Sequence, residues 1–515
     1  MNDLYEAGVT DNQLNLISEC DSNSMIAIKT PFGITERVKV NKFVSQGEVN
    51  SNLKCTVTVD SISQNHAINL KDHLYEYRNL IPVPPLGMVD DQVAASKCGL
   101  DSVLASSHLN AMTNVKKLQF GAQKCHKMHI GTSDILCSNN TIDTWSMETH
   151  KETPTSIFDF VDVEGDKHLI EKVKSDVYLG DVIQNNGKNN LNIKARMERG
   201  SAAINQICSM LDDLCLGEYY FEAAGVLRNS LLLSTLLSNS ESWYNLSKKD
   251  IKDLESIDEK FMRKVLSAHS KTPIEMLYLE NGYIPVQFII MTRRLNFLWY
   301  ILQQDPKSLL FQFFNAQLNN PIKGDWILTV KDDLKALKID LDFDSIKKLS
   351  KTKFKMMVKD RTKATALQYL IKLQGQHSKS QNIEYQNLHL QDYLKSGSNL
   401  TIQEKAFIFA ARTRMIELNC NFKQGKLDLT CRKCHAFDET QEHLLKCQAL
   451  CDNSLVTSNP KYHDLFCNDK FKVGTVGRIL LAKFKQLKSE TDNCNAMCTN
   501  VSLCAATDTI SVDLD

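Results

Sequence analysis

Short helical and hairpin patterns alternate over residues 1–187. Apolar residues recur at helical spacing in some stretches, while others are short apolar runs separated by turn residues, as in hairpins. This mixture favours an antiparallel sheet backed by helices, which is an α+β arrangement. The helical stretches are 4–17, 53–62 and 101–112, and the hairpins pair 25–29 with 36–40 and 86–89 with 93–95.

From about residue 190 to residue 415 the apolar period is 3.6 throughout, which predicts an all-α region. Two capping-box patterns mark helix starts, Ser247-x-x-Asp250 and Thr272-Pro273-Ile274-Glu275, the second with proline at the first helical position. After Cys420 the helical pattern gives way to a cysteine-containing module. The polar tail from about residue 489 is predicted to be unstructured.

The composition, with 43% hydrophobic and 24% charged residues in 515, is that of an ordinary globular protein. No run of about 18 apolar residues is present, which argues against a membrane-spanning helix. The first residues lack the basic and apolar segments of a secretory signal, so we expect an intracellular protein. Most of the 16 cysteines are then expected to be buried thiols.

The net charge of zero is a sum of unequal parts. Residues 1–187 hold 16 Lys+Arg against 24 Asp+Glu, residues 188–380 hold 29 against 21, and residues 381–515 hold 16 against 16. Within the basic part, residues 347–379 contain ten basic side chains and the single acid Asp360. Such a segment is either an ordinary solvated face or a surface that meets phosphates.

Two adjacent carboxylates, Asp90 and Asp91, lie at the predicted tip of the 86–95 hairpin. Like charges repel, so stability explains this pair poorly. Carboxylate oxygens are ligands that Mg²⁺ prefers, and two such ions can activate a 3′-hydroxyl and stabilise a leaving pyrophosphate. The alternative is a solvated Asp-Asp turn.

At these residues the sequence resembles the reverse transcriptase of LINE-type (non-LTR) retrotransposons. Four segments resemble motifs of that family in the family's order. They are residues 45–48 for motif B, 84–91 (PPLGMVDD) for motif C, 118–131 for motif D and 176–180 for motif E. The helices from residue 190 onward are similar to the thumb of these elements and the region beyond it. The resemblance implies an RNA-directed DNA polymerase palm.

The resemblance also implies a role for each matched residue. Asp90 and Asp91 would bind the catalytic Mg²⁺ ions, and Lys124 would lie near the triphosphate. Without the family, Lys124 could equally be a surface lysine.

Nucleic-acid contacts are implied in the same way. Gln46 and Gly47 would meet the incoming nucleotide and template, and the primer grip would comprise Tyr178, Leu179 and Gly180. The implied partners are an RNA template, a DNA primer and deoxynucleotides, in the cytoplasm and nucleus and without a membrane. Taken alone, Gly47 could be a turn glycine, and Tyr178 and Leu179 core residues.

The sequence departs from the family in two places. Met88 and Val89 precede the aspartates where the family usually has an aromatic residue and alanine. The family's motif A, which supplies another essential metal-binding aspartate, would lie just upstream of Asn2, and these residues hold no counterpart of it. Loss of a ligand from a two-metal site removes most transition-state stabilisation, so we expect little polymerase activity from this chain.

A second pattern is Cys431-x2-Cys434-x8-His443-x3-Cys447. Zinc takes four thiolate or imidazole ligands at tetrahedral geometry, and four ligands leave no open position, so this Zn²⁺ would be structural. His443 and Cys447, four residues apart, are expected on one helical face. Cys451 is an alternative fourth ligand, and a chance arrangement of cysteines is the other interpretation.

The residues around this pattern are basic, which suits nucleic-acid contact of the kind that zinc knuckles make. LINE-type elements often carry a similar C-terminal cysteine-histidine module. The neighbouring basic residues are Arg432, Lys433, His435 and Lys446.

Together these features predict an α+β protein that is a fragment of a retrotransposon reverse transcriptase. The alternatives are a non-catalytic nucleic-acid-binding remnant of such an element, including one put to host use, and a metal-free helical interaction protein. The predicted parts are an incomplete palm over 1–187, a helical thumb over 188–305, a basic α-helical extension over 306–415, a CCHC zinc-knuckle-like module with a flanking helix over 416–488, and a disordered tail over 489–515.

Overall fold

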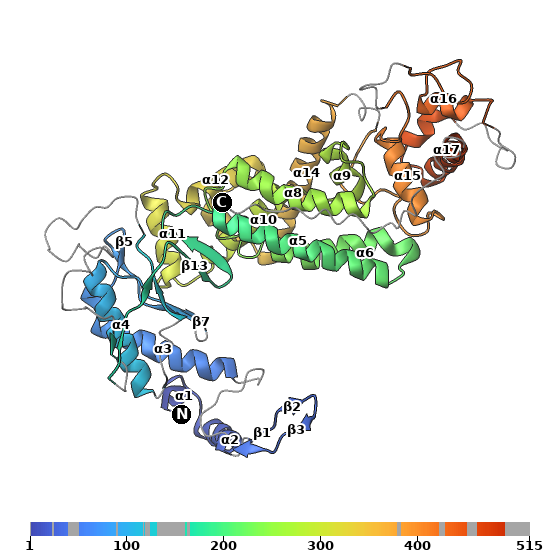
Figure 1. Ribbon diagram of the computed structural model, residues 1–515. Helices are drawn as coiled ribbons and strands as arrows, with labels where there is room; N and C mark the ends of the chain where they lie inside the picture. Colours follow the sequence, from blue (N-terminus) through green and yellow to red (C-terminus); the bar gives the residue numbers. More distant parts are fainter. Residues whose placement is uncertain are drawn as a thin grey trace, which may run out of the picture. The chain divides into compact units, whose positions relative to one another are not determined.

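The computed structural model describes residues 2–22, 25–39, 51–88, 91–116, 118, 124–130, 160–161, 165–377, 383–421, 428–450 and 461–489. These residues are mostly helical, and their strands all lie between residues 25 and 184, so the mixed α+β class is confirmed (Figure 1). The chain divides into two compact units. Unit 1 comprises Met1–Ala195, Ser242–Leu246 and Phe297–Lys331, and unit 2 comprises Arg196–Glu241, Ser247–Asn296 and Asp332–Asp515.

The predicted all-α region is confirmed, since every regular element described between residues 190 and 415 is helical. Its α-helices are α5 (Asn190–Asp213), α6 (Tyr220–Leu227), α7 (Leu233–Leu236), α8 (Lys248–Val265), α9 (Ile274–Asn281), α10 (Val286–Leu302), α11 (Leu309–Asn319), α12 (Trp326–Ala336), α13 (Phe343–Lys348), α14 (Lys351–Gln374) and α15 (Ile402–Arg412). Helices α1 (Asn2–Glu6), α2 (Asp11–Ser22), α3 (Ser51–Asn69) and α4 (Gly99–Val115) precede this region, and α16 (Gln441–Lys446) and α17 (Lys470–Ser489) follow it. Short 3₁₀ turns are η1 (Lys71–His73), η4 (Gly217–Tyr219) and η6 (Tyr462–Phe466), and η5 (Arg228–Leu232) is a π turn.

The single helix predicted over residues 4–17 is wrong, because α1 and α2 are separate. Gly8, at φ +89°, breaks the chain direction after α1. Thr10 then starts α2, where its backbone N–H and its hydroxyl both donate to Oε1 of Gln13. The helical spacing of apolar residues continues across the break and so hides it. Gly8 is the better indicator of where the first helix ends.

The predicted hairpins form, and the predicted antiparallel sheet is present in the described residues only as separate two-stranded sheets. Their strands are two to four residues long and pair only two by two, six pairs being antiparallel and one parallel. Ladders this short supply few backbone hydrogen bonds to hold a third strand. The antiparallel pairs are β1 (Met25–Ile26) with β4 (Val38–Lys39), β2 (Lys29–Thr30) with β3 (Gly33–Ile34), β5 (Glu76–Tyr77) with β6 (Ile81–Pro82), β7 (Leu86–Met88) with β8 (Asp91–Val93), β10 (Phe160–Val161) with β11 (Lys167–His168) and β13 (Ser175–Tyr178) with β14 (Asp181–Gln184), while β9 (His126–Lys127) and β12 (Glu171–Lys172) are parallel.

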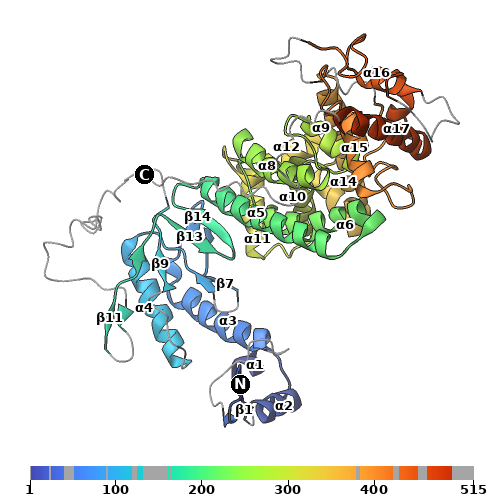
Figure 2. The same cartoon turned by 45° about the vertical axis from the view of Figure 1, so that its right-hand side comes forward.

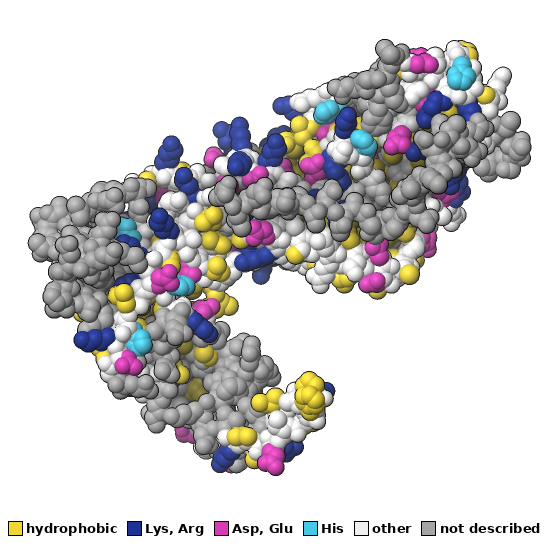
Figure 3. All heavy atoms as spheres, in the orientation of Figure 1, with side chains coloured by type: hydrophobic (Ala, Val, Ile, Leu, Met, Phe, Trp, Pro, Cys, Tyr) yellow, Lys and Arg dark blue, Asp and Glu magenta, His cyan; other side chains and the backbone are white. Residues whose placement is uncertain are grey.

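The hairpin β2–β3 presents apolar side chains to solvent at the tip of unit 1. Phe32 is fully exposed, and Ile28 and Ile34 are exposed for 63% and 73%. Figure 3 shows these hydrophobic side chains at the end of the hairpin. Nothing described in the chain covers this surface.

Helices α3 and α4 of unit 1 pack side by side, as both Figure 1 and Figure 2 show. Ile62 of α3 and Leu109 of α4 are both buried, with 1% and 5% of their surface exposed. The hairpin β7–β8 lies against α3, since a Cβ placed on Gly87 would lie 3.2 Å from Cγ1 of Val59. Glycine at position 87 therefore allows the close approach of hairpin and helix.

One of the two predicted capping boxes is confirmed. At α8, the hydroxyl of Ser247 accepts from the N–H of Asp250, and the Asp250 carboxylate accepts from the N–H of Ser247. At α9 the prediction is wrong by one position: Pro273 is the cap residue rather than the first helical residue, and no side chain caps the helix. With its extended ψ of 137°, Pro273 is the cap residue, and a proline side chain has no oxygen that could accept from the first turn.

Unit 2 contains buried ion pairs within its largely apolar core. Arg228, in the π turn η5, donates to both carboxylate oxygens of Asp258 on α8, at 2.7 and 2.5 Å, and both side chains are almost fully buried. Tyr278 of α9 donates to the same carboxylate at 3.1 Å. Buried charges of this kind are tolerated because each is paired and hydrogen-bonded.

A second buried network joins α9 to α15. The carboxylate of Glu280 accepts from Nε of Arg412 at 3.0 Å, from the hydroxyl of Tyr393 at 2.8 Å and from the hydroxyl of Tyr385. Arg412 also donates to the carbonyl oxygen of Leu465, at 2.7 Å, so the network reaches the segment before α17. Figure 2 shows α15 and α17 side by side, and they are in contact.

None of the helices in the described part of the chain combines the length and the apolar character that crossing a bilayer requires.

Candidate metal centre

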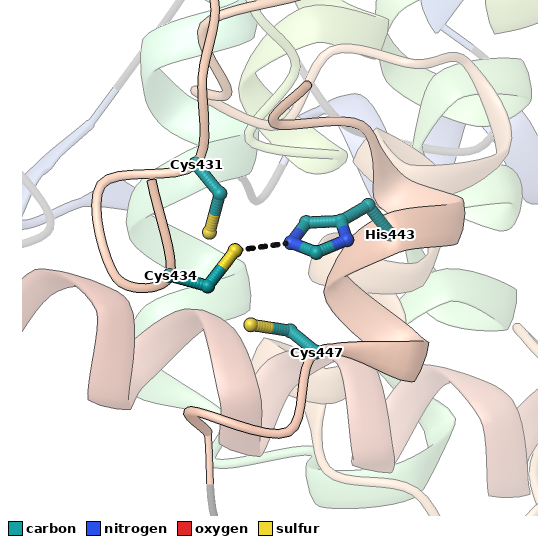
Figure 4. Close-up of side chains that lie close together, drawn as sticks. All are labelled: Cys431, Cys434, His443 and Cys447. Atoms are coloured by element: carbon teal, nitrogen blue, oxygen red, sulfur yellow. Dashed lines mark hydrogen bonds between the residues drawn. The ribbon is translucent and has the colours of Figure 1, made fainter. Parts of the chain in front are cut away.

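Four side chains of the C-terminal module converge on one point. The ligand atoms of Cys431, Cys434, His443 and Cys447 all lie within 4.8 Å of one another, and Figure 4 shows them pointing toward a common centre. Sγ of Cys434 is 3.3 Å from Nε2 of His443. Among the described residues, this is the one group of three or more His, Cys, Asp or Glu side chains that converges in this way.

The arrangement fits a tetrahedral zinc ion. With Zn–S bonds of about 2.3 Å and Zn–N bonds of about 2.0–2.1 Å, the ligand atoms of a tetrahedral Cys3His site are about 3.5–3.8 Å apart. The 3.3 Å between Cys434 and His443 is slightly shorter than this, and the other separations, all within 4.8 Å, need shifts of about 1 Å at most. The Cys3His group could therefore hold a metal such as zinc, as the spacing predicts.

A tight turn presents the first two cysteines. The N–H of Cys431 donates to the carbonyl of Phe437 at 2.7 Å, and the N–H of His435 donates to the carbonyl of Cys431 at 2.9 Å. His435 has φ +53°, so the chain reverses at this residue. Hydrogen bonds from the backbone around Ala436 lower the pKa of Cys434, which favours the thiolate that a metal needs.

The other two ligands come from α16 and the residue after it. The hydroxyl of Thr440 caps this helix by accepting from the N–H of His443 at 3.0 Å. Cys447 lies one residue past the helix end with extended backbone, so the expectation that His443 and Cys447 share a helical face is wrong in detail. Burial raises the pKa of the Cys447 thiol to about 11 in the metal-free protein. Metal binding would release this proton.

A buried carboxylate supports the turn. Glu439 is fully buried and accepts from Nε and Nη2 of Arg432, each at 2.8 Å, and from the N–H of Asn419 at 2.8 Å. Burial by itself raises the pKa of Glu439, but these hydrogen bonds outweigh it and the pKa lies below its usual value. Arg432, one of the basic residues expected to suit nucleic-acid contact, is thus also paired with a buried carboxylate of the module, while its side chain stays 31% exposed.

An exposed aromatic ring lies beside the cluster. Phe437 is 66% exposed, and its ring is tilted against that of His443 with centroids 5.4 Å apart. Lys446 is exposed nearby and pairs only with the exposed Glu442, at 3.2 Å. A ring of this kind can stack on a base, and a lysine can meet a phosphate.

The candidate polymerase residues are described only in part. Asp90, Gln46 and Gly47 lie outside the described residues, as does Cys451, the alternative zinc ligand. Asp91 is exposed at the start of β8, where it pairs with Met88 across the hairpin. Lys124 is described and exposed. Within the described residues, nothing gathers around Asp91 as a group of carboxylates that would hold Mg²⁺.

The residues predicted for the primer grip form the turn of a hairpin. Tyr178 pairs with Asp181, and Leu179 and Gly180 between them have φ +48° and +84°, as a two-residue turn with left-handed backbone requires. Leu179 is 44% exposed, so it is no core residue. Burial, and then the carboxylate charge of Asp91, raise the pKa of Tyr178.

Sequence reasoning missed three supporting residues. A usable signal exists for Glu439, because a glutamate between the two ligand pairs, with an arginine beside the first pair, hints at a supporting ion pair. Glu280 and Asp258 had no local signal, because their partners lie 20 to 132 residues away in the chain.

No model of a known protein family matches this chain. A search of curated proteins also finds no significant relative. The function is therefore argued from the residues and their geometry.

Proposed function

We propose that this chain is a C-terminal portion of a LINE-type reverse transcriptase and that it binds nucleic acid. In the intact element the palm would carry out template-directed nucleotidyl transfer by two-metal chemistry. The matched segments lie in the family's order along unit 1. The zinc-knuckle-like module follows the helical region, as the resemblance implies.

The observation that carries the proposal is the arrangement around the motif C hairpin. Helix α3, which follows motif B in the sequence, lies against this hairpin at Gly87. The charge of Asp91 at the hairpin also acts on Tyr178 of the motif E hairpin, which follows about 90 residues later. A palm would need these segments near one another, which supports the proposal.

The polymerase activity of this chain alone is expected to be low. Asp91 is exposed and these residues hold no counterpart of the motif A aspartate. Two-metal catalysis needs carboxylates on both sides of the ions, because each ion bridges the reacting phosphate. The nucleic-acid-binding function does not need this site.

The zinc module supplies a binding surface rather than catalysis. A Cys3His set closes the coordination of the metal, so the metal acts by fixing the turn and α16. The fixed turn holds Phe437 outward and α16 holds Lys446 outward, where they can reach a single-stranded nucleic acid. This role is also that of the second candidate function, a non-catalytic nucleic-acid-binding remnant of a retroelement.

One experiment separates these functions. The purified 515-residue chain is incubated with a DNA primer annealed to an RNA template, Mg²⁺ and deoxynucleotides, while binding and extension are followed together. We expect binding with little extension. Sustained extension would show an active polymerase and contradict the expected loss of activity, whereas absence of binding would contradict the proposed function itself. Reading the DNA upstream of Met1 in frame then separates the two ancestries of a binding protein.

A further inference from the structure

Helix α14 carries an unusual set of charges. Its 24 residues include seven basic side chains and only one acid, Asp360. All seven are exposed. None of them forms an ion pair with another residue in the described part of the chain. The seven are Lys351, Lys353, Lys355, Lys359, Arg361, Lys363 and Lys372.

Four of these lysines form a row. The buried side of α14 repeats every four residues, at Phe354, Val358, Thr362, Ala366, Leu370 and Gln374. Lys355, Lys359 and Lys363 each follow a buried residue directly, and Lys351 continues the same spacing toward the helix start. The row therefore keeps a constant angle to the buried side. At a rise of about 1.5 Å per residue, its charges are about 6 Å apart and span about 18 Å.

The helix is fixed in unit 2, so the row is held in place. The hydroxyls of Thr362 and Thr292 on α10 lie 2.8 Å apart, and the ring of Tyr369 packs edge-on against Phe288. Near the other end, the amide of Gln374 donates to the carbonyl of Ile383 at 2.8 Å. A ligand that meets the row does not have to order the helix first.

Stability gives no reason for this row. Lysines four residues apart on a helix repel one another, and the single acid of α14, Asp360, forms no ion pair with the row. The apolar side of α14 is buried inside unit 2. The exposed apolar residues of this helix, such as Met356 and Ile371, are isolated. A helix of this kind cannot insert an apolar face into a bilayer.

We propose that the lysine row of α14, defined as Lys351, Lys355, Lys359 and Lys363, binds the phosphate backbone of a nucleic-acid duplex without reading its sequence. The inference rests on the proposed function, which supplies the class of partner. A row of about 18 Å matches several phosphates, since each strand of a duplex carries one phosphate per about 3.4 Å of axis. Flexible lysine side chains suit such contacts, which position a duplex rather than specify it.

The test measures affinity as a function of salt. Fluorescence anisotropy follows binding of the full chain to a mixed-sequence DNA duplex of about 24 base pairs, from about 50 to about 200 mM KCl. The variant replaces the four lysines of the row by glutamine. A charge-matched control replaces Lys29, Lys39, Lys97 and Lys323, which are exposed elsewhere. A third variant replaces the row by arginine, which keeps its charge.

The row predicts a specific change in slope. Four phosphate contacts contribute about 3.6 to the slope of log affinity against log salt, so the glutamine variant should lose about that amount. The arginine variant and the charge-matched control should keep the wild-type slope. Unchanged helical content and unfolding temperature verify that the glutamine variant is folded, as expected for side chains without partners.

Each other outcome overturns one claim. If wild-type protein binds and the glutamine variant keeps its slope, the row is not the contact and the proposed function stands. If the control loses as much slope as the variant, net charge rather than the row is responsible. If wild-type protein does not bind the duplex at low salt, the proposed function fails. Tighter binding to vesicles with anionic lipid, lost in the same variant, would assign the row to a membrane instead.

Discussion

Arg432 lies between the first two cysteines of the metal centre and donates to both carboxylate oxygens of Glu439, each at 2.8 Å. Glu439 also accepts from the N–H of Arg432 at 3.0 Å, so the backbone of the turn and its arginine are held by one buried carboxylate. Such outer contacts orient metal ligands and raise metal affinity. The pair is therefore part of the metal centre although neither residue is a ligand.

Replacing Glu439 by glutamine should weaken zinc binding. The substitution turns one acceptor into a donor that faces Arg432 and leaves its charge unpaired in a buried place. Loss of such an outer contact typically costs about 10- to 100-fold in metal affinity. Competition against a chromophoric chelator measures the zinc dissociation constant. The control is Glu442→Gln, since Glu442 is exposed and pairs only with Lys446, and equal affinities for both variants would refute the role of Glu439.

Replacing Cys431 and Cys434 together by serine should abolish zinc retention. Serine hydroxyls are poor zinc ligands, and two of four ligands would be lost. Native mass spectrometry of the purified chain should find one zinc ion in the wild type and none in the double variant. Cys215→Ser is the matched control, because Cys215 is exposed and lies outside the cluster. An unchanged zinc content in the double variant would contradict the assignment.

Removing zinc with a chelator should loosen the C-terminal module and spare the helical region. Binding energy at a closed zinc site is folding energy, because the unfolded chain does not present the ligands together. Hydrogen exchange should quicken in α16, whose last turn joins two ligands, and in α17, which packs on α16. Exchange in α8 and α9 should stay as it was. If removal of zinc sped hydrogen exchange equally in all helices, or in none, the metal would not be what stabilises this module.

Neutralising Glu280 should destabilise unit 2 strongly. Glu280→Gln leaves the buried Arg412 without its counter-charge, and breaking a buried pair in this way costs about 3–5 kcal/mol. Tyr393→Phe removes one hydrogen bond to the same carboxylate and should cost about 1 kcal/mol. Urea unfolding followed by helical content measures both. Similar losses for the two variants would mean that the charge pair contributes little.

Acid should destabilise unit 1 through a buried histidine. Burial, and then the neighbouring ring of His108, lower the pKa of His66 to about 4. The unfolded chain binds this proton near the ordinary pKa of about 6.5, so stability is complete above that pH and is lost as the pH falls toward 4. At about pH 5 the loss is about 2 kcal/mol. In urea unfolding at several pH values, His66→Leu should remove that part of the pH dependence. The control His463→Gln, at an exposed histidine, should keep it. Identical pH profiles for the wild type and His66→Leu would refute the role of His66.

The sequence predicted what depends on near neighbours. The metal cluster was found because its ligands occupy a 17-residue stretch, in which CxxC and a short helix bring four donors together. The all-α region and the Ser247 capping box were found for the same reason. Local patterns also failed where one residue changes the backbone, at Gly8 and at Pro273.

What the sequence could not predict depends on distant partners. Arg412 was indistinguishable from a surface arginine until its contact with Glu280, 132 residues away, was known. Arg432 was one of four basic residues around the metal pattern, and only the structure shows that its guanidinium pairs with the buried Glu439. The absence of α14 ion pairs within the described residues likewise needed the positions of all acids around the helix.

The central claim is that this chain binds nucleic acid through its phosphate backbone. The most direct measurement is the affinity of the purified, zinc-loaded chain for an RNA template annealed to a DNA primer, at about 50 and about 200 mM KCl. The account predicts binding at the lower salt and an affinity about 100-fold weaker or more at the higher salt, as several phosphate contacts require. No binding at the lower salt, or an affinity that does not change with salt, would contradict it.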